Sequence, residues 1–139
     1  MARVNRWNPD TVAPPAGRYS HLASVPEGHE IVYLAGQLGV RPDGTLAGPD
    51  ARAQGEQIFA NLEALLSAAG GGPEHLVKLL TLVAGVEHLD GYRAAQAEAF
   101  KLWFPGDDFP AQSLAVVAAL AAPQYVVEVE AIAAIPRTS

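Results

Sequence analysis

Apolar side chains recur at helical spacing between residues 51 and 69. Ile58, Leu62 and Leu65 fall on one stripe, which predicts an amphipathic helix that packs on a core through that stripe. Asp50 directly precedes this stretch and is a suitable N-cap residue. The polar side chains of the stretch are expected to lie mostly off the stripe: Gln54, Glu56, Gln57 and Asn61.

A second helix is predicted from 89 to 103, with Tyr92 and Leu102 among the apolar residues of one side and a Phe-Pro-Gly run after it. The first helix contains Gly55, which costs roughly 1 kcal/mol against alanine in a helix interior. We therefore expect close backbone packing at Gly55. The Gly-Gly-Gly-Pro run at 70–73 ends the first helix.

Strands are predicted where the apolar residues form short continuous runs rather than helical stripes. Such runs indicate strands buried in a sheet, the run at 30–36 among them, and Arg-Pro-Asp-Gly at 41–44 has the composition of a hairpin turn. Residues 1–17 are rich in Pro, Asn and Gly and predict an irregular arm. The expected strands cover 19–24, 30–36, 76–85, 113–120 and 125–135.

The order of these elements predicts one α/β (α+β) domain spanning residues 1–139. A strand–helix–strand unit with short connections favours a mixed sheet with both helices packed on one face. Two helices cover only one face, yet the strands are almost uniformly apolar. The second face is therefore expected to be buried against other copies of the chain.

Composition removes several classes of function. The chain has 9 basic and 15 acidic residues and a formal net charge of −6, which argues against a nucleic-acid partner. It has no run of about 18 apolar residues that would span a membrane, and its N-terminal stretch does not resemble a secretory signal. It has no cysteine, so disulfides and thiolate chemistry are excluded. We expect a cytoplasmic protein.

The usual signatures of metal, nucleotide and serine chemistry are missing from the sequence. The 4 histidines are scattered without ligand spacing and are expected at the surface or in turns. The glycine run ends a helix instead of opening one, so it does not present a helix N-terminus to phosphate. No serine lies in a Gly-x-Ser-x-Gly elbow. We therefore expect neither a metal nor a cofactor.

Two carboxylates in the last apolar run invite a functional explanation. Glu128 and Glu130 are two residues apart in a strand, so both side chains point to the same sheet face. A carboxylate buried there without a partner would cost several kcal/mol. For Glu130, a solvated edge position or an arginine partner remains an equal alternative. For Glu128 we favour a partly buried functional carboxylate.

Several short motifs occur in order and at near-constant spacing from about 17 to 135. The motifs are AGQ at 35–37, AQxxQxxxNL at 53–62, AAG at 68–70, LVK at 76–78, EAF at 98–100, FPAQS at 109–113 and VEVEAIA at 127–133. Together they resemble the RidA/YjgF family. The resemblance implies a chorismate-mutase-like α/β fold, a homotrimer and three clefts between adjacent subunits. In well-studied members these clefts hydrolyse reactive imines and enamines to 2-oxo acids and ammonia.

The resemblance also implies roles for individual residues. Tyr19 matches the cleft tyrosine, Gly36 matches the glycine whose backbone borders the ligand, and Glu128 matches the acid that holds or activates water. Ala35 and Ser113, beside Gly36 and Gln112 in their motifs, are expected to contact the small-molecule ligand as well.

The main departure from the family is Gln112, because catalytic members have an arginine at this position that binds the substrate carboxylate. An amide is neutral and donates at most two hydrogen bonds from a single nitrogen, so it does not replace the guanidinium fork. Ala94 stands where some members have asparagine, and Leu114 where many have cysteine. Arg18 or Arg93 could supply the missing charge.

Four functions therefore remain open from the sequence. The first is a hydrolase or deaminase of the RidA type that acts through Gln112 and Glu128 on an imine without the usual carboxylate. The second is a trimeric small-molecule binder without turnover. Endoribonuclease activity, carried by an old family label, and a chorismate-mutase-type isomerase are less favoured, because both need cationic groups that the chain offers sparsely.

Overall fold

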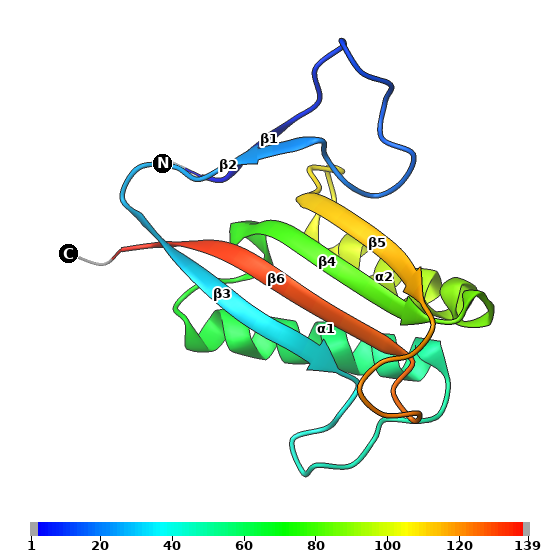
Figure 1. Cartoon of the computed structure of the whole chain (residues 1–139). Coiled ribbons are helices and arrows are strands. Elements are labelled where there is room, and N and C mark those ends of the chain that lie inside the picture. The colour runs from blue at the N-terminus through cyan, green and yellow to red at the C-terminus, as the bar shows by residue number, and fades with distance from the viewer. Residues whose placement is uncertain (1–2, 138–139) are drawn as a thin grey trace.

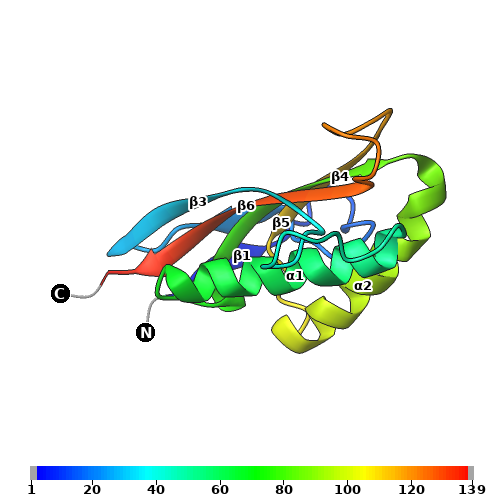
Figure 2. The ribbon, with the colours of Figure 1, turned by 90° about the horizontal axis from the view of Figure 1, so that it is seen from below.

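Four strands form the main sheet, and two long helices cover one of its faces (Figures 1 and 2). The computed structural model describes residues 3–137. No helix of that range is long and apolar enough to cross a membrane. The elements are β1 (Asn5–Trp7), β2 (Leu22–Ser24), β3 (His29–Leu38), α1 (Ala51–Ala68), β4 (Leu76–Ala84), α2 (Leu89–Trp103), β5 (Ala111–Val117) and β6 (Val127–Pro136), with short 3₁₀ helices at Pro73–His75 and Val86–His88.

The sheet is mixed, as predicted. Its strand order is β3-β6-β4-β5, and the last strand, β6, lies antiparallel between β3 and β4. The strands β4 and β5 pair in parallel, because α2 carries the chain back between them. The prediction that 30–36 forms a buried strand is wrong in one respect: β3 is an edge strand, and Tyr33 is 75% exposed.

The core lies between the sheet and the helices. In β6 the odd-numbered residues Val127 and Val129 are buried against the helices, while Glu128 and Glu130 point to the other face, as the period-two pattern predicts. Figure 2 shows both helices on one side of the sheet and none on the other. The second face therefore remains uncovered in one chain.

The two helices cross where Gly55 lies on α1. A β-carbon at this position would come within 2.9 Å of the Ala95 β-carbon on α2, so a side chain larger than hydrogen does not fit. This confirms the close packing expected at Gly55. The apolar stripes are narrower than predicted, because Leu65 is partly exposed and Leu102 is 81% exposed.

Gln54 contradicts the expectation that it lies off the buried stripe, since it is fully buried. Its amide nitrogen donates to the backbone oxygens of Gly48 and Gln124, both at 2.9 Å, and its amide oxygen accepts from the Val126 nitrogen at 3.0 Å. These bonds tie two loops to the start of α1. Asp50 occupies the N-cap position but makes no side-chain capping bond.

The N-terminal arm is more ordered than predicted. Its strand β1 pairs antiparallel with β2, which begins three residues later than the expected strand at 19–24. Arg6 fixes the arm to the domain by donating to the backbone oxygens of Glu74 and Leu76, while its guanidinium also pairs with Asp108 at 3.2 Å. Burial lowers the pKa of Arg6, and the neighbouring Asp108 opposes that effect.

Candidate functional site

A cavity of about 340 Å³ lies where the N-terminal arm meets α2 and β5. Three residues predicted to bind ligand, Tyr19, Gln112 and Leu114, line this cavity. The arm is held here because Ser20 bridges to Ala111 and its nitrogen donates to the Pro110 oxygen at 3.0 Å. The complete lining is Ala16, Gly17, Arg18, Tyr19, Arg93, Gln96, Gln112 and Leu114.

The Gln112 amide is fixed by its neighbours on two sides. Its oxygen accepts a hydrogen bond from the Gln96 amide nitrogen at 3.0 Å, and its nitrogen donates to the Arg18 backbone oxygen at 3.5 Å. The second bond is at the limit of hydrogen-bond length, so it constrains the amide weakly. One N–H of Gln112 is left to donate to a ligand.

Gln96 connects Gln112 to the core. Its amide nitrogen also lies 3.4 Å from the Tyr92 hydroxyl, which in turn lies 3.0 Å from the Thr81 hydroxyl on β4. Burial raises the pKa of Tyr92 to about 12, so the phenol stays protonated and remains a hydrogen-bond donor at neutral pH. The chain from Thr81 to Gln112 is neutral throughout, and it holds the Gln112 amide in one orientation.

Tyr19 is positioned by its own loop. Its hydroxyl accepts a hydrogen bond from the Ala16 backbone nitrogen at 3.2 Å, and its ring meets the His21 ring edge-on with centroids 5.6 Å apart. The His21 ring nitrogen lies 2.7 Å from the Ala13 oxygen. Tyr19 therefore forms a rigid wall of the cavity.

Glu128 and Gly36 lie together on the uncovered face of the sheet. The β3–β6 register shifts between Leu34 and Gln37, so that two residues of β3 oppose Glu130 alone, which is a β-bulge. A β-carbon at Gly36 would come within 2.8 Å of the Glu128 carboxyl carbon. Glycine at this position allows the Glu128 carboxylate to lie across the backbone of the bulge.

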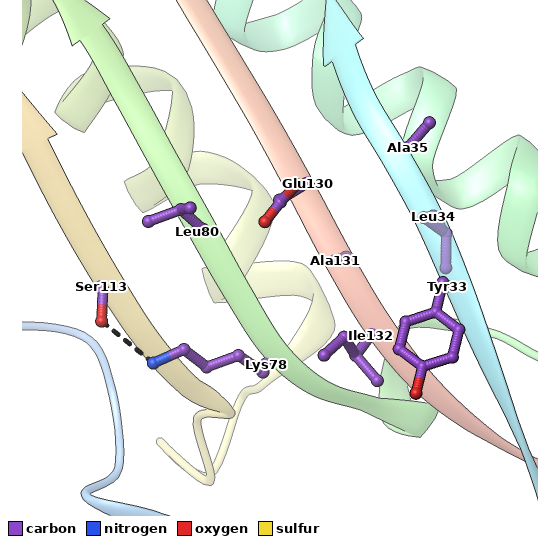
Figure 3. Close-up of a pocket in the computed structure, with 9 residues that line it drawn as sticks. All are labelled: Tyr33, Leu34, Ala35, Lys78, Leu80, Ser113, Glu130, Ala131 and Ile132. Atoms are coloured by element: carbon purple, nitrogen blue, oxygen red, sulfur yellow. Dashed lines mark hydrogen bonds between the residues drawn. The ribbon is translucent and has the colours of Figure 1, made fainter. Parts of the chain in front are cut away.

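A second, larger cavity of about 550 Å³ lies on the same uncovered face (Figure 3). Ala35 and Ser113 line it together with Glu130, and the Lys78 ammonium donates to the Ser113 hydroxyl at 3.0 Å. Figure 3 shows these side chains rising from β3, β6, β4 and β5. The other lining residues are Tyr33, Leu34, Leu80, Ala131 and Ile132, so the cavity is mostly apolar.

The predicted site residues thus fall on two faces of one sheet. Gln112 pairs with Leu79 in the β4–β5 register and points to the helices, where it meets Gln96. Glu128 pairs with Leu82 in the β4–β6 register and points to the uncovered face. The strand β4 separates them, so one chain does not bring both groups to one ligand. Ala94 is half-buried on α2 and does not line either cavity.

Gln96 belongs to the site but is not among the residues predicted from the sequence. A signal was available, because Gln96 follows Tyr92 by four residues and therefore shares the apolar side of its helix. A polar residue on such a face needs a partner. Within residues 3–137, no group of three or more histidine, aspartate or glutamate side chains is arranged to hold a metal ion.

Comparison with known proteins decides the family. The family model described as Endoribonuclease L-PSP, which represents the RidA/YjgF family, matches residues 10–135. The chain belongs to the RidA/YjgF family. This RidA/YjgF chain is 32% identical to the yeast protein HMF1 (Saccharomyces cerevisiae) over 120 residues, which are 86% of this chain and 85% of the yeast protein.

Solved structures agree with the RidA/YjgF assignment. The Rid-family protein YyfB of Yersinia pestis has 30% identity and a TM-score of 0.84, covering 96% of this chain and all of that one. A protein of Entamoeba histolytica, named for endoribonuclease L-PSP, has 33% identity and a TM-score of 0.66, covering 87% of this chain and 90% of that one. The RidA-like mixed sheet with two helices on one face is thereby confirmed.

Proposed function

We propose that the chain forms a homotrimer whose clefts, each built between two subunits, bind a small molecule and hydrolyse an imine or enamine without a carboxylate on the reacting carbon. The observation that carries the proposal is the placement of Gln112 and Glu128 on opposite faces of the sheet. A cleft that uses both residues has to take Gln112 from one subunit and Glu128 from its neighbour.

The uncovered face supports assembly. It exposes Ile31 and Tyr33, which are 47% and 75% accessible, beside the apolar cavity of about 550 Å³. Contiguous apolar surface of this kind is typical of an interface between subunits. Association through this face would also shield Lys78 and Glu130 from water, so we expect each of them to meet a polar partner across the interface.

The chemistry requires one carboxylate and one water molecule. The imine enters protonated on nitrogen, and the Glu128 carboxylate accepts a proton from water as the water oxygen bonds to the imine carbon, which gives a neutral carbinolamine. Glu128 returns this proton to the carbinolamine nitrogen. The C–N bond then breaks as the carbinolamine hydroxyl gives its proton to Glu128, so that a carbonyl compound and ammonia form, and this last proton leaves with ammonia as ammonium.

Gln112 shapes the choice of substrate. Its remaining amide N–H donates one ordinary hydrogen bond, which suits a carbonyl or amide oxygen next to the imine carbon. A carboxylate at the same place would lose the bidentate, charge-assisted contact that an arginine provides. The substrate of this site is therefore neutral beside its reacting carbon.

The competing functions find less support. Endoribonuclease activity, which the names of several relatives carry, needs a basic surface for the phosphate backbone, whereas the chain has a net charge of −6. An isomerase acting on a dicarboxylate would place one of the two carboxylates against the neutral amides of Gln96 and Gln112, which carry no positive charge to bind it. A binder without turnover uses the same cleft and is separated from the hydrolase only by experiment.

The lack of cysteine fits a cytoplasmic location.

The test compares two substrates that differ only in charge beside the reacting carbon. Base-promoted loss of HCl from 3-chloroalaninamide gives an enamine that tautomerises to 2-iminopropionamide in place, and 3-chloroalanine gives 2-iminopropionate by the same route. Ammonia release is followed for both, and thermal shift is measured with pyruvamide. The proposal expects the protein to accelerate ammonia release from the amide more than from the carboxylate. A thermal shift without acceleration would favour the binder.

A further inference from the structure

We infer that Arg18 and Arg93 form an anion-binding subsite in the cavity that contains Gln112, and that the ligand carries a carboxylate some distance from its reacting carbon. Both arginines line this cavity of about 340 Å³ together with Tyr19 and Gln96. The inference rests on the proposed function only in taking this cavity as part of the binding cleft.

The two arginines reach the cavity from different elements. The Arg18 backbone oxygen accepts a hydrogen bond from the Gln112 amide nitrogen at 3.5 Å. The Arg18 side chain therefore begins at the cavity wall beside Gln112. Arg93 lies on α2 three residues before Gln96, on the same side of the helix. Residues spaced this way have β-carbons about 5–6 Å apart. Arg93 therefore lies about one helical turn from the Gln96–Gln112 amide pair.

Neither arginine is neutralised within residues 3–137. The guanidinium groups of Arg6 and Arg52 are engaged by carboxylates, whereas Arg18 and Arg93 form no ion pair there. Arg18 also borders a neighbouring cavity that includes Asp107, but the two do not form an ion pair.

The charge of this cavity is opposite to that of the molecule. Among the described residues, its lining contains two arginines and neither aspartate nor glutamate, although the chain carries a net charge of −6. A concave site with charges of one sign concentrates ligands of the opposite sign. Its volume is that of a small-molecule site, so the anion it fits is a small organic one.

The two parts of the cavity suit a ligand with two chemically different ends. The neutral amide pair of Gln96 and Gln112 suits an uncharged carbonyl or imine, and the arginines suit a carboxylate about one helical turn away. A ligand with a carboxylate joined through two methylene groups to its reacting carbon has these two ends, as in 4-oxopentanoate. Its amide, 4-oxopentanamide, has nearly the same shape without the charge.

Calorimetric titration with these two compounds tests the inference. We expect 4-oxopentanoate to bind roughly tenfold or more tightly than 4-oxopentanamide, and added salt to weaken only the acid. R93Q and R18Q should each weaken binding of the acid by roughly tenfold and leave binding of the amide unchanged. The matched control is R137Q, which changes an exposed arginine directly after β6 and should alter neither affinity.

The inference is overturned if the acid binds no better than the amide, if both arginine variants bind the acid as the parent does, or if neither compound binds at millimolar concentration. These outcomes are separate from failure of the hydrolase. Preference for the acid without any imine turnover would leave the subsite standing and remove the hydrolase. Turnover of 2-iminopropionamide without preference for the acid would support the hydrolase and remove the anion-binding subsite.

Discussion

Gln112 and Glu128 lie on opposite faces of one sheet, with β4 between their strands. Gln112 points to α2, where its amide oxygen accepts a hydrogen bond from Gln96 at 3.0 Å, while the Glu128 carboxylate lies over Gly36 on the face without helices. A ligand that touches both residues has to lie between two chains. The proposed oligomer and the proposed chemistry therefore depend on each other.

The first prediction concerns assembly through the uncovered face. Light scattering behind a sizing column should give about three times the chain mass of 14.6 kDa. Tyr33→Asp places a charge on the exposed part of this face, on the edge strand β3, and should shift the protein toward monomer. Leu102→Asp, at an exposed position on α2, is the matched control and should leave the mass unchanged. A monodisperse monomer of the parent chain at micromolar concentration would contradict this.

The second prediction distinguishes the two carboxylates of β6. Glu128→Gln should abolish hydrolysis of 2-iminopropionamide, because the amide does not accept the proton from water. Glu130→Gln should retain most of the activity, since Glu130 lies opposite the bulge in the larger cavity and is expected not to contact the ligand. Both variants should keep the oligomeric mass of the parent. If Glu130→Gln is the damaging change, the functional carboxylate is Glu130 and not Glu128, two residues further along β6.

The third prediction concerns the missing guanidinium. The parent protein should hydrolyse 2-iminopropionate two to three orders of magnitude more slowly than an arginine-bearing member of the family, because the charge-assisted contact is lost. Gln112→Arg should recover part of this rate. Recovery should be incomplete, because Gln96 is placed to hold the amide of Gln112 and not a guanidinium. Leu114 and Ala94 also differ from the residues that other family members have at these positions. Equal rates for the parent and the arginine-bearing member would show that the contact is not needed.

Arginine substitution then locates any replacement charge. If the parent hydrolyses 2-iminopropionate well, Arg18→Gln and Arg93→Gln should each reduce kcat/KM for this substrate while leaving 2-iminopropionamide unaffected. The result would indicate that an arginine of the cavity holds the α-carboxylate itself.

The fold could be predicted largely because its signals are local. The helical spacing of Ile58 and Leu62 and the apolar runs of β4 and β6 do not need distant partners to be recognised. Burial of Gln54 was missed because two of its three partners, Gln124 and Val126, lie about 70 residues away along the chain. The strand β1 was missed for the same reason, since its three residues pair with β2 in a later segment.

The sequence predicts which residues belong to the site but not how they contact one another. The sequence singles out Tyr19, Gln112 and Glu128, but it does not reveal that Gln96 holds Gln112, because this bond joins a helix to a strand across a turn. Nor do the residues reveal which groups share a cavity. That depends on the order of the strands, which brings Ala35 of β3 and Ser113 of β5 to one cavity although β6 and β4 lie between them.

The fourth prediction uses the buried phenol behind Gln96. The pKa of Tyr92 is about 12 in the folded chain and about 10 when unfolded. The unfolded state therefore loses its proton first, and the stabilisation present below pH 10 is lost as pH rises through 12. The free energy of unfolding of the parent should fall relative to that of Tyr92→Phe by about 1 kcal/mol between pH 9 and pH 11.

Urea unfolding of both proteins at a fixed concentration measures this difference, and other titrating groups cancel in the comparison. Tyr92→Phe should be less stable at pH 8, because the Thr81 hydroxyl and the Gln96 amide each lose a partner. A constant difference between the two proteins from pH 9 to pH 11 would contradict a buried, protonated phenol.

Complementation between two inactive variants tests the shared cleft most directly. Gln112→Leu and Glu128→Gln chains, each inactive alone on 2-iminopropionamide, are co-expressed with different tags, and mixed oligomers are purified through both. Every trimer that contains both variants has an intact Gln112 beside an intact Glu128 of the neighbouring chain in about one third of its clefts. We therefore expect activity of that order relative to the parent, whereas mixed oligomers as inactive as the separate variants would contradict a cleft built from two subunits.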